Sequence, residues 1–147
     1  MTTPSPAAFV RPLIIDPAGK RFLLLSACPS GAAGVTWTIP VVPVRTCESF
    51  ARAATNYLQQ QTGLPWPQIA PVIGRFPAGP GRQRPEYVVL APLPSPAWPK
   101  YLPERAGRWW TTAQLRAARD VVEPAILPDF IDGYWDGWLP DGEISLE

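Results

Sequence analysis

Apolar residues occur along the chain in short runs that proline, glycine and aspartate separate, a pattern typical of β-strands. Strands are predicted over Phe9–Ile15 and Arg21–Cys28, and the turn sequence Asp16-Pro17-Ala18-Gly19 between them favours a hairpin. The same criterion predicts further strands over Val35–Ile39, Ile69–Phe76, Glu86–Leu93 and Arg108–Trp110.

A helical spacing of apolar residues predicts a helix over Thr46–Thr62, with Thr46 as N-cap and Gly63 as its stop. Its inward side should carry Phe50, Ala53, Ala54, Tyr57, Leu58 and Gln61. Later helices are predicted over Ala113–Val122, capped by Thr111 or Thr112, and over Pro128–Trp138. On the last one, Asp129, Asp132 and Asp136 should form a solvated acidic face. Strands mixed with crossover helices predict an α/β domain with a mixed sheet.

Composition narrows the possible chemistry. The 147 residues suit a single domain over 1–147, and we expect residues 1–8 to form a flexible tail. Twenty-one prolines should stiffen the connections between elements. The chain contains no histidine, which excludes histidine-ligated zinc or haem, Ser-His-Asp and Cys-His catalysis, and a histidine pH switch.

Charge and targeting signals restrict the partners. Thirteen basic against twelve acidic residues leave a net charge of +1, so we expect neither nucleic acid nor a membrane surface as partner. The opening MTTPSPAAFV lacks the features of a signal peptide, and no apolar run approaches the ~18 residues of a membrane span. We therefore expect a cytoplasmic protein in which Cys28 and Cys47 are reduced thiols.

One segment carries a motif. The stretch WTIPVVPVRTCESFARAATNYLQQQTGL (Trp37–Leu64) resembles the box of the Nudix hydrolase family, G-x5-E-x7-R-E-U-x-E-E-x-G-U, where U is a bulky apolar residue and Trp-x-x-Pro-Gly-Gly leads in. Trp37 and Pro40 match the lead-in, Glu48 the first glutamate and Gly63 the closing glycine. The segment Arg108–Leu115 resembles the family's later Trp-x5-Leu stretch. The resemblance implies a Nudix-like α/β/α sandwich with a mixed β-sheet.

Several residues of the family pattern are absent from this sequence, among them three of its glutamates. Val41 and Val42 replace the two glycines, Asn56-Tyr57 replaces Arg-Glu, and Gln60-Gln61 replaces Glu-Glu. In active Nudix enzymes those glutamates bind the Mg²⁺ or Mn²⁺ that activates water, and hard cations need anionic oxygen ligands. We therefore expect no metal, no cofactor and no metal-dependent diphosphate hydrolysis.

The pattern instead suggests a binding pocket. Tyr57, Gln60 and Gln61 are predicted to line a polar cavity with Trp37. Around the loop of residues 77–85, Arg75, Arg82 and Arg84 could clamp a phosphate or carboxylate. Such a cavity would bind a small-molecule ligand or a protein partner. A blander interpretation stays open for both sets: Gln61 would then cap nearby backbone, and the arginines would sit on a solvated hairpin tip.

Two other classes of function stay open. The chain could be a Nudix-type hydrolase with a rearranged site, or a metal-independent enzyme acting on a non-phosphate substrate. The catalytic candidates are then Glu48, Tyr57, Glu104 and Cys47. Alternatively, the chain could be an interaction module that presents Trp135 and Trp138, for example as a homodimer.

Overall fold

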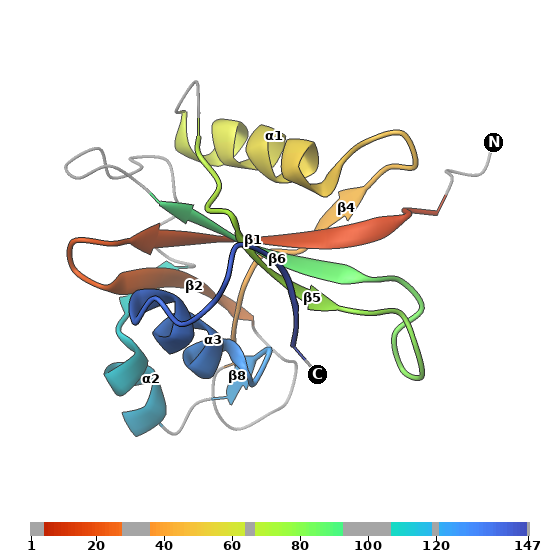
Figure 1. Ribbon diagram of the computed structural model, residues 1–147. Helices are drawn as coiled ribbons and strands as arrows, with labels where there is room; N and C mark the ends of the chain where they lie inside the picture. The colour runs from red at the N-terminus through yellow and green to blue at the C-terminus, as the bar shows by residue number, and fades with distance from the viewer. Residues whose placement is uncertain (1–4, 28–35, 64–66, 93–106, 119–120, 147) are drawn as a thin grey trace.

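The fold is built on one mixed β-sheet, seen close to edge-on in Figure 1. The computed structural model describes residues 5–27, 36–63, 67–92, 107–118 and 121–146. Within them nine strands follow the order β8-β3-β2-β1-β6-β5-β9, with β4 beside β1 and β7 beside β2. The strands are β1 (Ala8–Asp16), β2 (Arg21–Ala27), β3 (Thr36–Thr38), β4 (Val42–Val44), β5 (Val72–Phe76), β6 (Glu86–Pro92), β7 (Gly107–Trp110), β8 (Val121–Glu123) and β9 (Gly142–Ser145).

The central strand β1 combines both kinds of pairing. It pairs antiparallel with β2, which confirms the predicted hairpin, and parallel with β6 over the register Phe9↔Glu86 to Ile15↔Pro92. The two predicted strands β5 and β6 pair antiparallel, whereas β3 with β8 and β5 with β9 are parallel pairs. The predicted mixed sheet is therefore confirmed.

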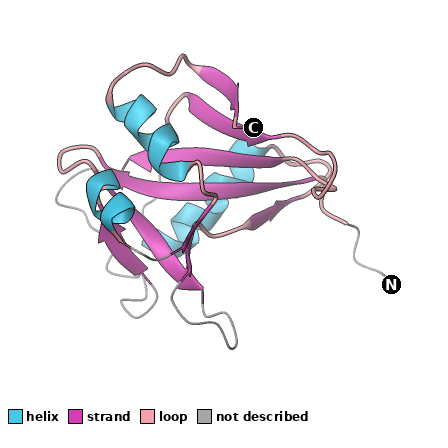
Figure 2. Cartoon of the chain, turned by 90° about the horizontal axis from the view of Figure 1, so that it is seen from below, coloured by secondary structure: helices cyan, strands magenta, loops and turns pink. Residues whose placement is uncertain are grey.

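Helices cover both faces of this sheet. Helix α1 (Phe50–Thr62) lies on one face, and α2 (Thr112–Ala117) and α3 (Leu127–Trp135) lie on the other, as Figures 1 and 2 show. The larger core cluster fills the α2/α3 side and includes Phe22, Leu24, Trp110 and Ile131. Two smaller clusters fill the α1 side around Ala53, Ala54, Leu58 and Leu23. The predicted α/β/α sandwich is confirmed.

The predicted start of α1 at Thr46 is wrong. Ser49 is the N-cap: its backbone is extended, and its hydroxyl accepts a hydrogen bond from the Arg52 amide at 3.1 Å. The preceding residues form a turn in which the Glu48 amide donates to the Arg45 carbonyl. Glu48 and Cys47 thus lie before the helix rather than in its first turn. Gly63 is the stop, as predicted, with φ at +72°.

Two later boundaries also differ. Helix α2 begins after Thr111, one of its two predicted caps, but ends at Ala117, because Val121–Glu123 pairs with β3 as strand β8. Helix α3 ends at Trp135 instead of Trp138. Gly137 adopts φ +71° and turns the chain there, so Trp138 leaves the apolar side of the helix and is 83% exposed.

The predicted acidic face of α3 is only partly solvated. The Arg116 guanidinium of α2 donates to Asp129 at 2.8 Å and also to Asp132, while the Thr112 hydroxyl donates to Asp132 at 2.7 Å. Two of the three predicted surface carboxylates therefore tie α3 to α2.

Two residues of the expected flexible tail 1–8, Ala7 and Ala8, contact the sheet. The Ala7 amide donates to the Val44 carbonyl, and Ala8 is buried as the first residue of β1.

Candidate functional site

The α1 positions where the sequence resemblance implies metal-binding glutamates are occupied by Tyr57, Gln60 and Gln61. Ala53, Ala54 and Leu58 are buried against the sheet as the helical spacing predicts. Tyr57 and Gln61 are half-buried and Gln60 is exposed. Tyr57, Gln60 and Gln61 therefore offer one phenol and two amides.

Tyr57 lines a narrow apolar crevice between α1 and the sheet. The other lining residues are Pro12, Ile14, Leu23, Leu25 and Pro40. The free volume of this crevice is about 10 Å³, room for a single water molecule. Burial raises the pKa of the Tyr57 phenol above its ordinary value of 10.0, so the group is neutral at pH 7. The crevice can hold the uncharged hydroxyl but provides no anionic oxygen for a cation.

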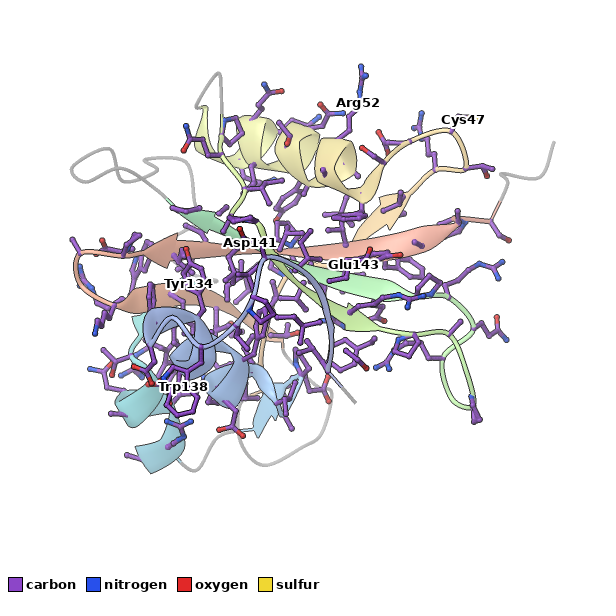
Figure 3. The ribbon with its side chains drawn as sticks, viewed as in Figure 1. Cys47, Arg52, Tyr134, Trp138, Asp141 and Glu143 are labelled. Carbon is purple, nitrogen blue, oxygen red and sulfur yellow. The ribbon has the colours of Figure 1, made fainter. Side chains whose placement is uncertain are left out.

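The other catalytic candidates do not join Tyr57. Glu48 and Cys47 precede Ser49, which lies about 12 Å along the helix axis from Tyr57 at 1.5 Å per residue. Cys47 is exposed, at the end of α1 remote from the helix's last turn (Figure 3). Glu104, like Cys28, lies outside the described residues.

Trp37 does not share a pocket with Tyr57. It packs edge-on against Trp110, with ring centroids 5.2 Å apart, within the core cluster of the α2/α3 side. Tyr57 belongs to a cluster on the opposite face of the sheet. The expectation that these two aromatic residues line one cavity is therefore not met.

The arginines predicted to clamp an anion are also apart from Tyr57, since none of them lines its crevice. Arg75 lies opposite Tyr87 in the β5–β6 pair, and its buried Nε atom has no hydrogen-bond partner in the described part of the chain. Arg84 donates from Nε to the Pro6 carbonyl at 2.7 Å, so the β5–β6 connection is fastened to the N-terminal segment. Neither contact supports a common clamp with Gln60 and Gln61.

A larger cavity, of about 490 Å³, opens on the α3 side of the sheet. Its polar residues are Arg11, Arg82, Glu86 and Glu123, and its apolar walls are Phe76, Pro124, Ala125, Ile126 and Leu146. The cavity is assembled from β1, the β5–β6 hairpin, the end of β8 with the segment between it and α3, and the residue that follows β9.

Arg11 is the best-anchored polar group in this cavity. Its Nε donates to Glu86 at 3.0 Å, and its Nη1 donates to the Thr38 hydroxyl at 3.1 Å and to the Ile39 carbonyl at 3.3 Å. The Arg11 and Glu86 side chains are only 16% and 18% exposed. These contacts leave the Nη2 donors for a further acceptor, because no described residue bonds them. The sequence interpretation missed this pair, although an arginine inside the apolar run FVRPLII was a usable signal.

The cavity and the crevice share no lining residue, but one short segment contacts both. Arg11 bonds the Ile39 carbonyl from the cavity, and the next residue, Pro40, lines the crevice beside Tyr57. Ile39 and Pro40 therefore lie between Arg11 on the α3 side of the sheet and Tyr57 on the α1 side.

Charges around the cavity balance: Arg11 and Arg82 oppose Glu86 and Glu123. Glu86 is already held by Arg11, with Arg82 Nε 3.8 Å from its second oxygen. Within the described ranges no three Asp, Glu or Cys side chains gather as they would around a metal ion. The described helices include none that is long and apolar enough to cross a bilayer.

Comparison with known proteins identifies the architecture. No family model matches the sequence, and no curated protein matches it. Among solved structures, the C. elegans Ap4A hydrolase is similar with a TM-score of 0.63 and 19% identity, over 89% of this chain and 97% of that one.

Two further structures agree. A Nudix hydrolase from Nitrosomonas europaea superimposes with a TM-score of 0.61 and 18% identity over 93% of both chains. The MutT protein from Methanosarcina mazei Go1 does so with a TM-score of 0.54 and 19% identity, over 92% of this chain and 97% of that one. At such identities the likeness concerns the fold, and the chain has the fold of the Nudix hydrolases.

Proposed function

We propose that this Nudix-fold chain binds a small molecule and does not hydrolyse diphosphates with a divalent metal. The cavity around Arg11 is its ligand site. The lack of metal-dependent hydrolysis rests on one observation, the set of side chains on α1 where the resemblance implies metal-binding glutamates.

A divalent metal needs anionic oxygen at that place. Tyr57 contributes a neutral phenol within an apolar crevice, and Gln60 and Gln61 contribute amide dipoles without charge. Replacing three carboxylates by these groups removes three negative charges from one locality. The attraction for Mg²⁺ or Mn²⁺, and with it the activation of a water molecule, is lost.

The cavity has the size and character of a ligand site. Its volume of about 490 Å³ falls within the ~300–1,000 Å³ that small-molecule pockets occupy. Phe76 and Ile126 provide apolar wall, while Arg11 and Glu86 provide a donor and an acceptor held by their mutual ion pair. Because the charges of the lining balance, the cavity favours an uncharged or zwitterionic ligand over a strongly anionic one.

Restoring the carboxylates tests the proposal. Calorimetric titration with Mn²⁺ should show no saturable binding to the natural chain. The triple variant that combines Tyr57→Glu, Gln60→Glu and Gln61→Glu should bind Mn²⁺ clearly. If a carboxylate at position 57 prevents folding, the double variant Gln60→Glu with Gln61→Glu takes its place.

The matched control combines Arg52→Glu with Asn56→Glu on exposed positions of α1. It changes the net charge by the same amount as the triple variant and should not bind Mn²⁺, because neither of its new carboxylates stands at a position where the resemblance implies a metal-binding glutamate. For the double variant, Arg52→Glu alone is the matched control. The proposal is wrong if the natural chain binds Mn²⁺ and hydrolyses nucleoside diphosphate substrates in its presence.

A further inference from the structure

Besides the α1 crevice and the cavity around Arg11, a third hollow lies between the N-terminal segment and the β5–β6 connection. It is a groove of about 460 Å³, lined by Ser5, Pro6 and Phe9 on one side and by Gly81, Arg82, Gln83 and Arg84 on the other. Glu86 and Arg82 belong both to this groove and to the cavity around Arg11. The Arg82–Glu86 pair thus forms the wall between the two hollows.

Arg84 is held in the groove by its backbone contact. Its Nε donates to the Pro6 carbonyl at 2.7 Å, which fixes the plane of the guanidinium. The Nη1 and Nη2 donors make no hydrogen bond to any described residue. A fixed fork of donors is the geometry with which arginine binds phosphate or carboxylate oxygens in pairs.

The residues that line the groove carry a net positive charge. Arg82 and Arg84 face one carboxylate, Glu86, whereas the cavity lining carries two basic and two acidic residues. Glu86 is also engaged from the cavity side, because its Oε2 accepts from Arg11 Nε at 3.0 Å. The Arg82 guanidinium is 4.5 Å from the centre of the Phe76 ring, a contact that supports its position.

We propose that this groove is an anion site that binds a phosphate group. The two terminal nitrogens of Arg84 and the exposed Gln83 amide supply the donors, and Arg82 adds positive charge. These donors exceed what the two oxygens of a carboxylate need and suit the three terminal oxygens of a phosphate monoester. The site does not depend on the cavity ligand or on the absence of a metal at α1.

Amide NMR titration with inorganic phosphate at low ionic strength tests the site in the full chain. Saturable shifts are expected at Gly81, Arg82, Gln83 and Arg84, with acetate binding more weakly. Arg84→Gln should raise the Kd about tenfold, the equivalent of one charge-assisted hydrogen bond pair. Arg84→Lys keeps the charge but loses the fork, and should weaken binding by a smaller factor.

Arg52→Gln is the matched control, since Arg52 is an exposed α1 residue that extends away from the sheet (Figure 3). It loses the same charge and should leave the Kd within about twofold. Three results would overturn the site: no saturable shift at the groove, equal weakening by Arg52→Gln and Arg84→Gln, or acetate binding as tightly as phosphate. If Arg84→Gln loosens the N-terminal segment, the comparison of Arg84→Lys with Arg52→Gln decides.

Discussion

At the scale of single residues, Tyr57 and Arg11 bring different chemistry to the two faces of the sheet. Tyr57 fills an apolar crevice with a neutral phenol. Arg11 lies within the apolar strand β1. Its guanidinium lines the cavity on the α3 side of the sheet, where it forms an ion pair with Glu86. A largely buried charge needs a partner that compensates for its lost hydration, and Arg11 and Glu86 are such partners for each other.

Asp132 shows how a partner changes a carboxylate. Burial acts to raise its pKa, but hydrogen bonds from Thr112 and Arg116 outweigh burial and hold the pKa below the ordinary 3.8. Because the folded-state pKa lies below that of the unfolded chain, the stabilisation is present above about pH 4 and is lost as pH falls through the folded pKa.

Asp132→Asn should therefore lower the urea midpoint at pH 7. Its difference from the natural chain should narrow as the pH is taken below 3.8. Asp136→Asn removes the same charge from an exposed position and should leave the midpoint nearly unchanged. An equal effect of the two substitutions at pH 7 would show that the Thr112 and Arg116 contacts contribute nothing.

At the scale of elements, short local signals decide where the helices begin and end. The stretch Thr46–Ser49 contains two hydroxyl residues that could each cap α1. The chain uses Ser49, because the turn that the Glu48 amide and the Arg45 carbonyl close places Ser49 in the extended conformation before the first helical residue. The Ser49 cap then leaves Cys47 in the exposed turn, outside the first turn in which the helix dipole acts.

Alanine substitutions at Ser49 and Thr46 test which of the two residues caps α1. Ser49→Ala should cost about 1 kcal/mol of unfolding free energy, because the Arg52 amide loses its acceptor. Thr46→Ala, at an exposed turn position, should cost less than ~0.5 kcal/mol. Urea denaturation measures both, and the reverse order of the two costs would restore the helix start predicted from the sequence.

At the scale of the whole molecule, the cavity is a product of assembly. Arg11 and Glu86 are 75 positions apart in the sequence, and the parallel β1–β6 register brings them to one end of the sheet. The segment before α3 then covers that end with Pro124 and Ile126. No single element contains all the residues that line the cavity.

Filling the cavity tests its role. Ile126 is 37% exposed at its edge, so Ile126→Trp should fold while occupying part of the volume. A panel of uncharged and zwitterionic heteroaromatic fragments should shift the Arg11 and Thr38 signals of the natural chain in NMR. Ile126→Trp should weaken the best fragment at least ~10-fold, or about 1.4 kcal/mol.

Ala113→Trp is the control, because it adds an indole to an exposed position of α2. It should leave fragment binding unchanged. Fragments that bind Ile126→Trp as tightly as the natural chain, or that never shift Arg11 and Thr38, would remove the cavity from the proposed function.

Local pattern predicts much of the scaffold and little of the site. The β1–β2 hairpin, the β5–β6 pair, most of α1 and the start of α3 follow from turn residues and periodicity. The strands β4, β8 and β9 were not predicted, because three or four residues carry too weak a pattern and their pairing partners lie far away in the chain. The expected aromatic cavity failed for a related reason: periodicity does not tell which face of a sheet a strand residue such as Trp37 will take.

The sequence by itself determined which side chains stand at the positions where the resemblance implies metal-binding glutamates. Side-chain identity at Tyr57, Gln60 and Gln61 fixes the number of carboxylates however the chain folds. The tertiary structure alone decided where the cavity lies and that Arg11, Arg82 and Glu86 meet beside it. The physical reason is the sequence distance over which each feature is determined. Side-chain charge and local periodicity depend on residues close together in the sequence, whereas a cavity depends on strand registers and connections that join distant segments.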